Sequence, residues 1–250
     1  MIEQADGRRA LRLELLIMLA VSYGLSALIA VLQLADAAVR GLGTQQIPLN
    51  PRRSHVDVID FGLNAAWAIQ LFAWGALALY LLWRSGNGPA DIGINPRPRL
   101  GDLLGAAGLA ALIGIPGLAL YLIARAWGLN AELIPAAVDD AWWHVPMLIV
   151  TAFANGFAEE VIVVGYLLTR LGQLGLSRPA ALACSALLRG SYHLYQGLGA
   201  GLGNVVMGVV FGYAWQRTGR LWPLVLAHGL IDSVAFVGYS LFASKLGWLR

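Results

Sequence analysis

Charged residues and cysteine are both scarce in this sequence. Asp, Glu, Lys and Arg make up 12% of the 250 residues, whereas 58% are hydrophobic, and the mean hydropathy is +0.67. Soluble globular domains carry about 25% charged residues, so this composition excludes that class and predicts an integral membrane protein. The single cysteine, Cys184, excludes an internal disulfide. Because it lies within an apolar run, we interpret it as a small core residue.

Several familiar catalytic signatures are also missing. The sequence has no H-E-x-x-H zinc motif, no G-x-S-x-G nucleophile elbow and no glycine-rich phosphate-binding loop. The net charge of +3 comes from arginines in short connections between apolar runs, not from a cluster on one face. These patterns exclude the common soluble hydrolases and nucleotide-binding proteins, and we expect no nucleic-acid partner.

Seven apolar runs are long enough to cross a bilayer as helices, which takes about 20 residues at ~1.5 Å per residue. The first run follows Arg8, Arg9 and Arg12, as a signal-peptide core would, but its length and the lack of a clear A-x-A cleavage site predict a retained span. We therefore predict an all-α fold: one polytopic membrane helix bundle of about seven transmembrane helices, forming a single domain over residues 1–250. The predicted spans are residues 13–35, 58–83, 103–127, 145–171, 179–195, 198–215 and 222–241.

The distribution of basic residues predicts how the bundle is oriented. With a cytoplasmic amino terminus, ten arginines fall in cytoplasmic segments and six basic residues, including Lys245 and Arg250, fall outside. Membrane proteins carry an excess of Lys and Arg in their cytoplasmic loops. We therefore expect a cytoplasmic amino terminus and, with an odd number of spans, an external carboxyl terminus.

The carboxylate pair Glu159 and Glu160 interrupts the fourth apolar run. A charge at the centre of a bilayer costs about 2.5 to 3.5 kcal/mol on insertion scales, so such residues indicate a functional site with polar partners. Thr151, Asn155 and Glu159 recur every four residues and share a helix face, from which Glu160 is rotated by about 100°. We interpret Glu159 as a base facing a cavity, with Asn155 in support and Glu160 as a partner. The reverse assignment of the two glutamates stays open.

Two further polar pairs lie on later helices. Arg189 and His193 are four residues apart in the fifth run, and His228 and Asp232 are four residues apart in the last, so each pair shares a helix face. An arginine at membrane depth seeks a carboxylate, and we predict that Arg189 pairs with a glutamate, preferably Glu160. Asp232 is spaced to orient the imidazole of His228. Purely structural pairing stays open for each of these groups.

Glu159, His193 and His228 together suit two kinds of hydrolytic chemistry. Two histidines and a glutamate can bind Zn²⁺ with a vacant position for water. The same groups can activate water without a metal, the glutamate taking the proton and the histidines stabilising the oxyanion. The sequence leaves the cofactor open between a divalent metal such as zinc and none. Tyr23, in contrast, is interpreted as a packing residue.

Residues 145–242 resemble the CPBP intramembrane protease family, which includes the type II CAAX prenyl endopeptidases and bacterial CAAX-protease-like bacteriocin-immunity proteins. The motifs of that family are a glutamate pair followed by an arginine, a histidine preceded by a phenylalanine, and a histidine followed four residues later by asparagine or aspartate. They correspond here to Glu159 with Glu160, to His193, and to His228 with Asp232. The resemblance thus makes residues 145–242 the catalytic core.

Two positions differ from the pattern of that family. Val164 stands at the position of the arginine, and Arg189 stands at the position of the phenylalanine. We hypothesise that the positive charge missing from the fourth span is supplied by Arg189 from the fifth, so that a glutamate is neutralised across helices.

The resemblance implies an endopeptidase that hydrolyses a membrane-associated peptide or protein with glutamate- and histidine-activated water, in a bacterial plasma membrane. The implied partners are membrane lipid and a peptide or membrane-protein substrate, and the use of prenylated CAAX termini stays open. Two other functions stay open. The buried polar groups suit a proton-coupled transporter, and the departure at Val164 suits a catalytically silent membrane scaffold or immunity protein.

Overall fold

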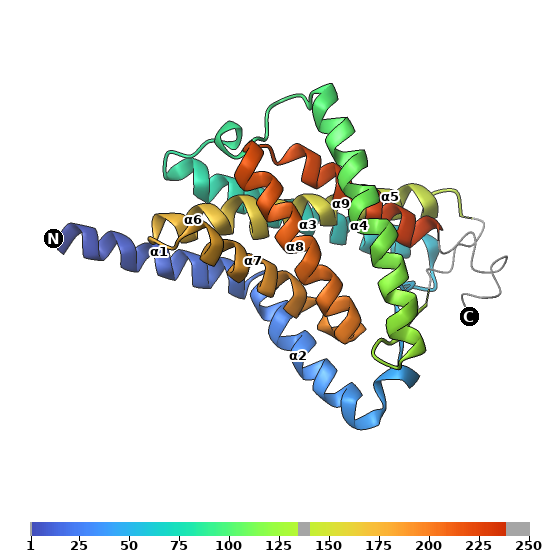
Figure 1. The fold of residues 1–250 in the computed structure, drawn as a ribbon. Helices are drawn as coiled ribbons and strands as arrows, with labels where there is room; N and C mark the ends of the chain where they lie inside the picture. The colour runs from blue at the N-terminus through green and yellow to red at the C-terminus, as the bar shows by residue number, and fades with distance from the viewer. Residues whose placement is uncertain (1, 135–140, 239–250) are drawn as a thin grey trace.

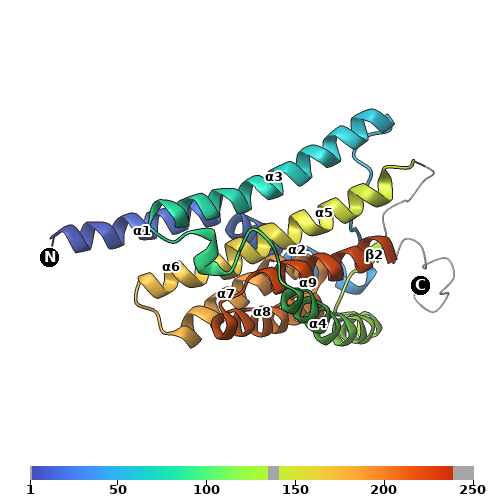
Figure 2. The same cartoon turned by 90° about the horizontal axis from the view of Figure 1, so that it is seen from above.

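A computed structural model describes residues 2–134 and 141–238 of the chain. The helices lie side by side in a bundle, with one short parallel pair of strands, which confirms the predicted all-α class (Figures 1 and 2). In chain order the elements are α1 (Ile2–Ala20), α2 (Tyr23–Arg40), η1 (Leu42–Thr44), β1 (Gln46–Pro48), α3 (Asp57–Arg84), η2 (Pro89–Ile92), α4 (Leu100–Ala126), β2 (Glu132–Ile134), α5 (His144–Glu159), η3 (Glu160–Tyr166), α6 (Leu167–Gln173), α7 (Arg178–Tyr192), η4 (Leu194–Gln196), α8 (Leu198–Thr218), α9 (Trp222–Ser233) and η5 (Val234–Gly238).

Within the described residues, five helices are long and apolar enough to cross a membrane by length and composition, rather than the seven predicted. They are α2, α3, α4, α8 and the continuous helix His144–Gln173 formed by α5, η3 and α6. The predicted run 179–195 covers all but the first residue of the 15-residue α7, and the run 222–241 contains the 12-residue α9, which η5 extends. Alone, α7 and α9 are shorter than the ~20 residues that span hydrocarbon. The predicted ends at 241 and 242, together with Lys245 and Arg250, lie outside the described residues.

The first predicted span, residues 13–35, is not one helix. The chain turns at Val21 and Ser22, so that α1 ends at Ala20 and α2 starts at Tyr23 at an angle to it (Figure 1). The Ser22 hydroxyl donates to the carbonyl of Met18 at 2.6 Å, and such a bond competes with the helical ladder. A Cβ on Gly24 would lie 2.7 Å from the Leu19 carbonyl oxygen, so the turn needs a glycine at this position.

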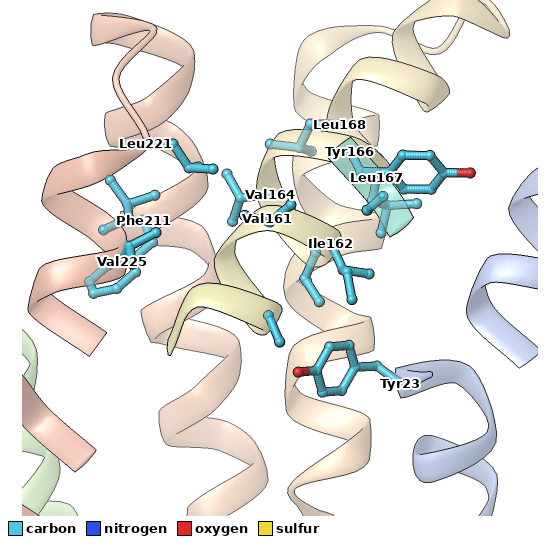
Figure 3. Packing of buried hydrophobic residues seen from close by; sticks show 14 of the residues in the cluster. Tyr23, Val161, Ile162, Val164, Tyr166, Leu167, Leu168, Phe211, Leu221 and Val225 are labelled. Carbon is cyan, nitrogen blue, oxygen red and sulfur yellow. The ribbon is translucent and has the colours of Figure 1, made fainter. Parts of the chain in front are cut away.

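A π-helical segment carries the glutamate pair into the core. Glu160–Tyr166, labelled η3, has wider turns than the α-helices on either side, and π turns of this kind are frequent at functional sites. All seven of its residues are buried, and Figure 3 shows Val164 and Ile162 reaching to different sides of the bundle. The Ser185 hydroxyl donates to the carbonyl of Val163 at 2.6 Å, which satisfies an oxygen inside the wide turns.

The two short helices pack against this central helix and its neighbours. α9 lies against α5 and α4, whereas α7 lies against α8 and α2. α7 is buried on only part of its surface, and Cys184, predicted to be a core residue, is exposed on it. The hydrophobic core is therefore built around η3. Packing in this core places α7 and α9 next to the glutamate pair.

A glycine contact sets the distance between α5 and α9. A Cβ on Gly156 would lie 2.9 Å from the backbone nitrogen of Gly229 and 3.1 Å from both the Cβ of His228 and the carbonyl oxygen of Val225. Two of these three atoms belong to the backbone of α9, which cannot yield as a side-chain tip can. The backbones therefore approach closely at the level of His228.

We expect Gly156→Ala to destabilise the protein by about 1–3 kcal/mol, because the added methyl group overpacks this contact. The measurement is the thermal unfolding midpoint in detergent. Gly108→Ala is the matched control, because Gly108 is an exposed helical glycine of α4 with open space around it. If Gly156→Ala unfolded at the same temperature as the control, the close approach would not limit the packing of α5 and α9.

Arg170, a buried cation on α6, holds α1 against the bundle. The guanidinium of Arg170 lies 2.7 Å from the Glu14 carboxylate, and it donates to the Ser85 hydroxyl and the Leu81 carbonyl at 2.7 and 2.9 Å. The Tyr166 hydroxyl donates to the same Glu14 oxygen at 2.9 Å. These bonds join α1 and α3 to the helix that carries the glutamate pair.

Candidate active site

A buried ion cluster forms where η3, α7 and α9 meet. The Oε1 atom of Glu160 lies 2.7 Å from Nη2 of Arg189 and 2.7 Å from Nδ1 of His228. The side chains of Glu160 and Arg189 are fully buried, and that of His228 nearly so. One carboxylate oxygen therefore contacts two nitrogen groups from two other helices.

The predicted pairing of Arg189 with Glu160 is confirmed. Nη1 of Arg189 also lies 3.8 Å from Oε2 of Glu159, so one guanidinium faces both carboxylates. Its nitrogens make no aligned hydrogen bond with the described residues, and the ring of Phe211 lies 5.8 Å from the guanidinium carbon. Arg189 thus acts mainly through its charge, which offsets carboxylates that would otherwise be buried without compensation.

Glu159 has a different environment from its neighbour. The Tyr192 hydroxyl donates to Oε2 of Glu159 at 2.6 Å, and the described residues provide no hydrogen bond to Oε1. Glu159 keeps 2% of its surface exposed, whereas Glu160 has none. Both glutamates therefore keep one oxygen without a hydrogen bond from the described residues, Oε1 of Glu159 and Oε2 of Glu160, but only Glu160 has its other oxygen engaged by two nitrogen groups.

Asp232 joins the cluster from the end of α9. Asn155 donates to Oδ2 of Asp232 at 2.8 Å, and Nε2 of His228 lies 3.6 Å from the same oxygen. The second distance is within ion-pair range but too long for a hydrogen bond. His228 therefore lies between Glu160 on one side and Asp232 on the other.

His193 lies at the carboxyl end of α7, one residue after Tyr192. Its Nδ1 is 3.0 Å from the backbone carbonyl of Arg189, which can only accept, so Nδ1 carries the proton of this bond. Glu159 interacts electrostatically with both His193 and His228. Both histidines thus lie near Glu159, although His193 makes no direct bond to either glutamate.

Thr151 departs from the predicted polar stripe. Asn155 and Glu159 belong to the site, but Thr151 lines a separate pocket near the start of α5 together with Asp60 and His144. In that pocket His144 Nε2 lies 3.6 Å from Asp60. The polar residues of the stripe therefore belong to two separate sites along the helix.

The residues present do not fit a zinc site formed by Glu159, His193 and His228. No group of three His, Cys, Asp or Glu side chains in the described part of the chain is arranged to hold a metal ion. Arg189 also stands 3.8 Å from Glu159, where its positive charge would repel a divalent cation. The guanidinium therefore supplies positive charge at the place where a metal would do so.

Tyr192 is a site residue that the sequence analysis missed. Its hydroxyl contacts Glu159 directly, and its ring lies 4.7 Å from the ring of His193. The available signal was its spacing: Tyr192 is three residues after Arg189 and therefore shares a helix face with it. Tyrosine is common in membrane helices, so this spacing alone does not distinguish a site residue from a packing residue.

Comparison with protein-family models identifies the carboxy-terminal part of the chain. Residues 141–234 match the family described as type II CAAX prenyl endopeptidase Rce1-like. Neither the curated proteins nor the solved structures gave a match. The matched region contains the glutamate pair, Arg189, both site histidines and Asp232, the residues on which the sequence resemblance rested. The chain is an integral membrane protein whose residues 141–234 are similar to the Rce1-like family of type II CAAX prenyl endopeptidases.

Proposed function

We propose that this protein is an intramembrane endopeptidase that hydrolyses a membrane-associated peptide or protein with water activated by Glu159. One observation carries the proposal: Glu159 has an oxygen without a hydrogen bond and keeps 2% of its surface exposed, beside a fully buried Glu160 whose charge is already compensated by Arg189 and His228. The match of residues 141–234 to a protease family supports the reaction class. The transporter alternative has no comparable support, because residues 141–234 match a protease family.

The reaction needs one proton acceptor and a set of donors. Glu159 takes a proton from water as the water oxygen attacks the scissile carbonyl carbon. The carbonyl oxygen becomes an oxyanion, which histidine N–H groups stabilise. When the tetrahedral intermediate collapses, the carbon–nitrogen bond breaks and the proton held by Glu159 passes to the departing amine. The products are a carboxylic acid and an amine, and the glutamate is regenerated.

The remaining polar residues position these groups. Tyr192 holds one oxygen of Glu159 and so orients the other. Arg189 and Glu160 fix the position of His228, and Asn155 fixes Asp232 on its other side. Preorganised dipoles of this kind cost no reorganisation during the reaction.

The substrate is proposed to be a peptide or protein segment that lies in or on the membrane, because the site lies in the core of a membrane bundle. We keep the cytoplasmic placement of the amino terminus as part of the proposal, on the strength of the arginine distribution. A preference for prenylated carboxyl termini is not part of it.

The test is peptide cleavage by the purified protein in liposomes, with products identified by mass spectrometry. We expect His228→Ala to lower kcat/KM about 10²- to 10³-fold, as expected for loss of a group that stabilises the oxyanion. His55→Ala is the matched control, because His55 is exposed and lies far along the sequence from the site. The control should cleave at the wild-type rate.

Two outcomes would contradict the proposal. Proton flux across the liposome membrane without peptide cleavage would favour the transporter. Binding of a membrane partner without cleavage or flux would favour a silent scaffold.

A further inference from the structure

Tyr23 has a buried hydroxyl group that no described residue satisfies. It lies at the start of α2, outside the family-matched region, and is 5% exposed. Its oxygen has no hydrogen-bond partner among the described residues. Figure 3 shows the ring reaching from α2 into the core below η3, with the hydroxyl directed away from its own helix.

The surroundings of Tyr23 are those of the active site. Its ring lies 4.8 Å from the ring of Tyr192, which bonds Glu159, and 6.1 Å edge-on from the ring of Trp74. Tyr23 also interacts electrostatically with Glu159 and Arg189. Tyr23 therefore contacts the tyrosine that holds Glu159, the group that we propose to activate water.

Packing alone does not explain the hydroxyl. A phenylalanine would fill the same aromatic contacts with Tyr192 and Trp74 without burying an unpaired polar group. Burying a hydroxyl away from water without a partner is unfavourable, and native proteins seldom do it. An unpaired hydroxyl at an active site is therefore suited to form its hydrogen bond with a polar group of the bound substrate.

We propose that Tyr23 is a catalytic residue whose hydroxyl donates a hydrogen bond to the scissile carbonyl oxygen of the substrate. The inference rests on the proposed function and adds a donor from α2 to it. The neighbouring phenol, Tyr192, already donates its hydrogen bond to Glu159, and Arg189 is held by the two glutamates. Tyr23 is thus a neutral donor that remains unused in this part of the site.

The chemistry predicts which kinetic constant changes. A carbonyl oxygen is a modest acceptor in the substrate and gains negative charge in the tetrahedral transition state. A hydrogen bond to it therefore strengthens during the reaction, so its loss lowers kcat more than it raises KM. Tyr23 keeps its own proton throughout, and the proton balance of the hydrolysis is unchanged.

The test compares wild type with Tyr23→Phe in the liposome cleavage assay. We expect kcat to fall about 100-fold, the scale for one lost oxyanion donor, with KM little changed. The unfolding temperature should stay the same or rise, because the variant removes an unsatisfied polar group. Tyr166→Phe is the comparison for a structural tyrosine: losing its bond to Glu14 should lower the unfolding temperature but leave cleavage per folded molecule unchanged.

Each other outcome overturns the inference in a recognisable way. If Tyr23→Phe cleaves like wild type while Glu159→Gln is inactive, Tyr23 is not a donor and the proposed function stands. If Tyr23→Phe unfolds at lower temperature and its cleavage falls only with the folded amount, the hydroxyl is structural. If wild type cleaves no membrane peptide, the proposed function fails and this inference fails with it.

Discussion

Glu159→Gln is expected to lower peptide cleavage about 10²- to 10⁴-fold, the usual contribution of a positioned general base. Glutamine has nearly the same size, and its amide oxygen can accept the bond from the Tyr192 hydroxyl. It cannot take a proton from water at neutral pH. The variant should therefore fold like wild type, and the loss should appear in kcat when product release is followed in liposomes.

Glu160→Gln is the matched comparison, because it makes the same chemical change one residue away. Here the amide cannot offset Arg189 and His228, so two nitrogen groups lose their shared anion. We expect this variant to lose folded yield, in contrast to Glu159→Gln. If Glu160→Gln instead folds normally and is inactive while Glu159→Gln cleaves, the roles of the two glutamates are reversed.

Arg189→Leu is expected to destabilise the protein by about 3–5 kcal/mol, the cost of removing one partner from a buried ion pair. The leucine would fill much of the space but leave Glu159 and Glu160 without their common cation. Folded yield and thermal unfolding in detergent measure the effect, and cleavage should fall with them. Unchanged yield and unchanged proteolysis would refute the idea that Arg189 replaces the arginine missing at Val164.

Two further variants separate charge from position. Arg217→Leu is the control, because Arg217 is exposed at the end of α8 and serves neither glutamate. Adding Val164→Arg to the Arg189→Leu protein returns a cation to the helix that carries the glutamates. Partial recovery of folded yield would show that the charge matters more than the helix that supplies it.

The ion pairs of the site could be predicted because charge is rare in the spans. Away from the ends of the predicted spans there are only three carboxylates, Glu159, Glu160 and Asp232, and a buried guanidinium cannot stay unpaired. Because carboxylates are scarce in the spans, the partner of Arg189 could be predicted from a few candidates. The contacts of Tyr192 and Tyr23 had no such signal, because a tyrosine in an apolar helix is stable with or without a site nearby.

The number and continuity of the spans were harder to predict, for a physical reason. Hydropathy measures how long an apolar run is, whereas the helix within it ends where the backbone turns, as at Ser22, or where a short helix lies against neighbours, as in α7 and α9. The predicted run 13–35 was wrong for the first reason. For the second reason, α7 and α9 fall short of the length that the five longer described helices reach.

The wide turns of η3 change what a motif spacing means. In an α-helix, four residues bring the chain back to nearly the same side, but a π turn closes through an i to i+5 bond, so four residues stop short of it. Glu160 and Val164 both lie in this segment, so their separation along the chain is not a measure of how they face each other. If a relative has a regular α-helix at this point, a residue-by-residue sequence alignment would therefore pair residues whose side chains point in different directions. Positions 160–166 should be matched to relatives by geometry before any residue there is judged present or missing.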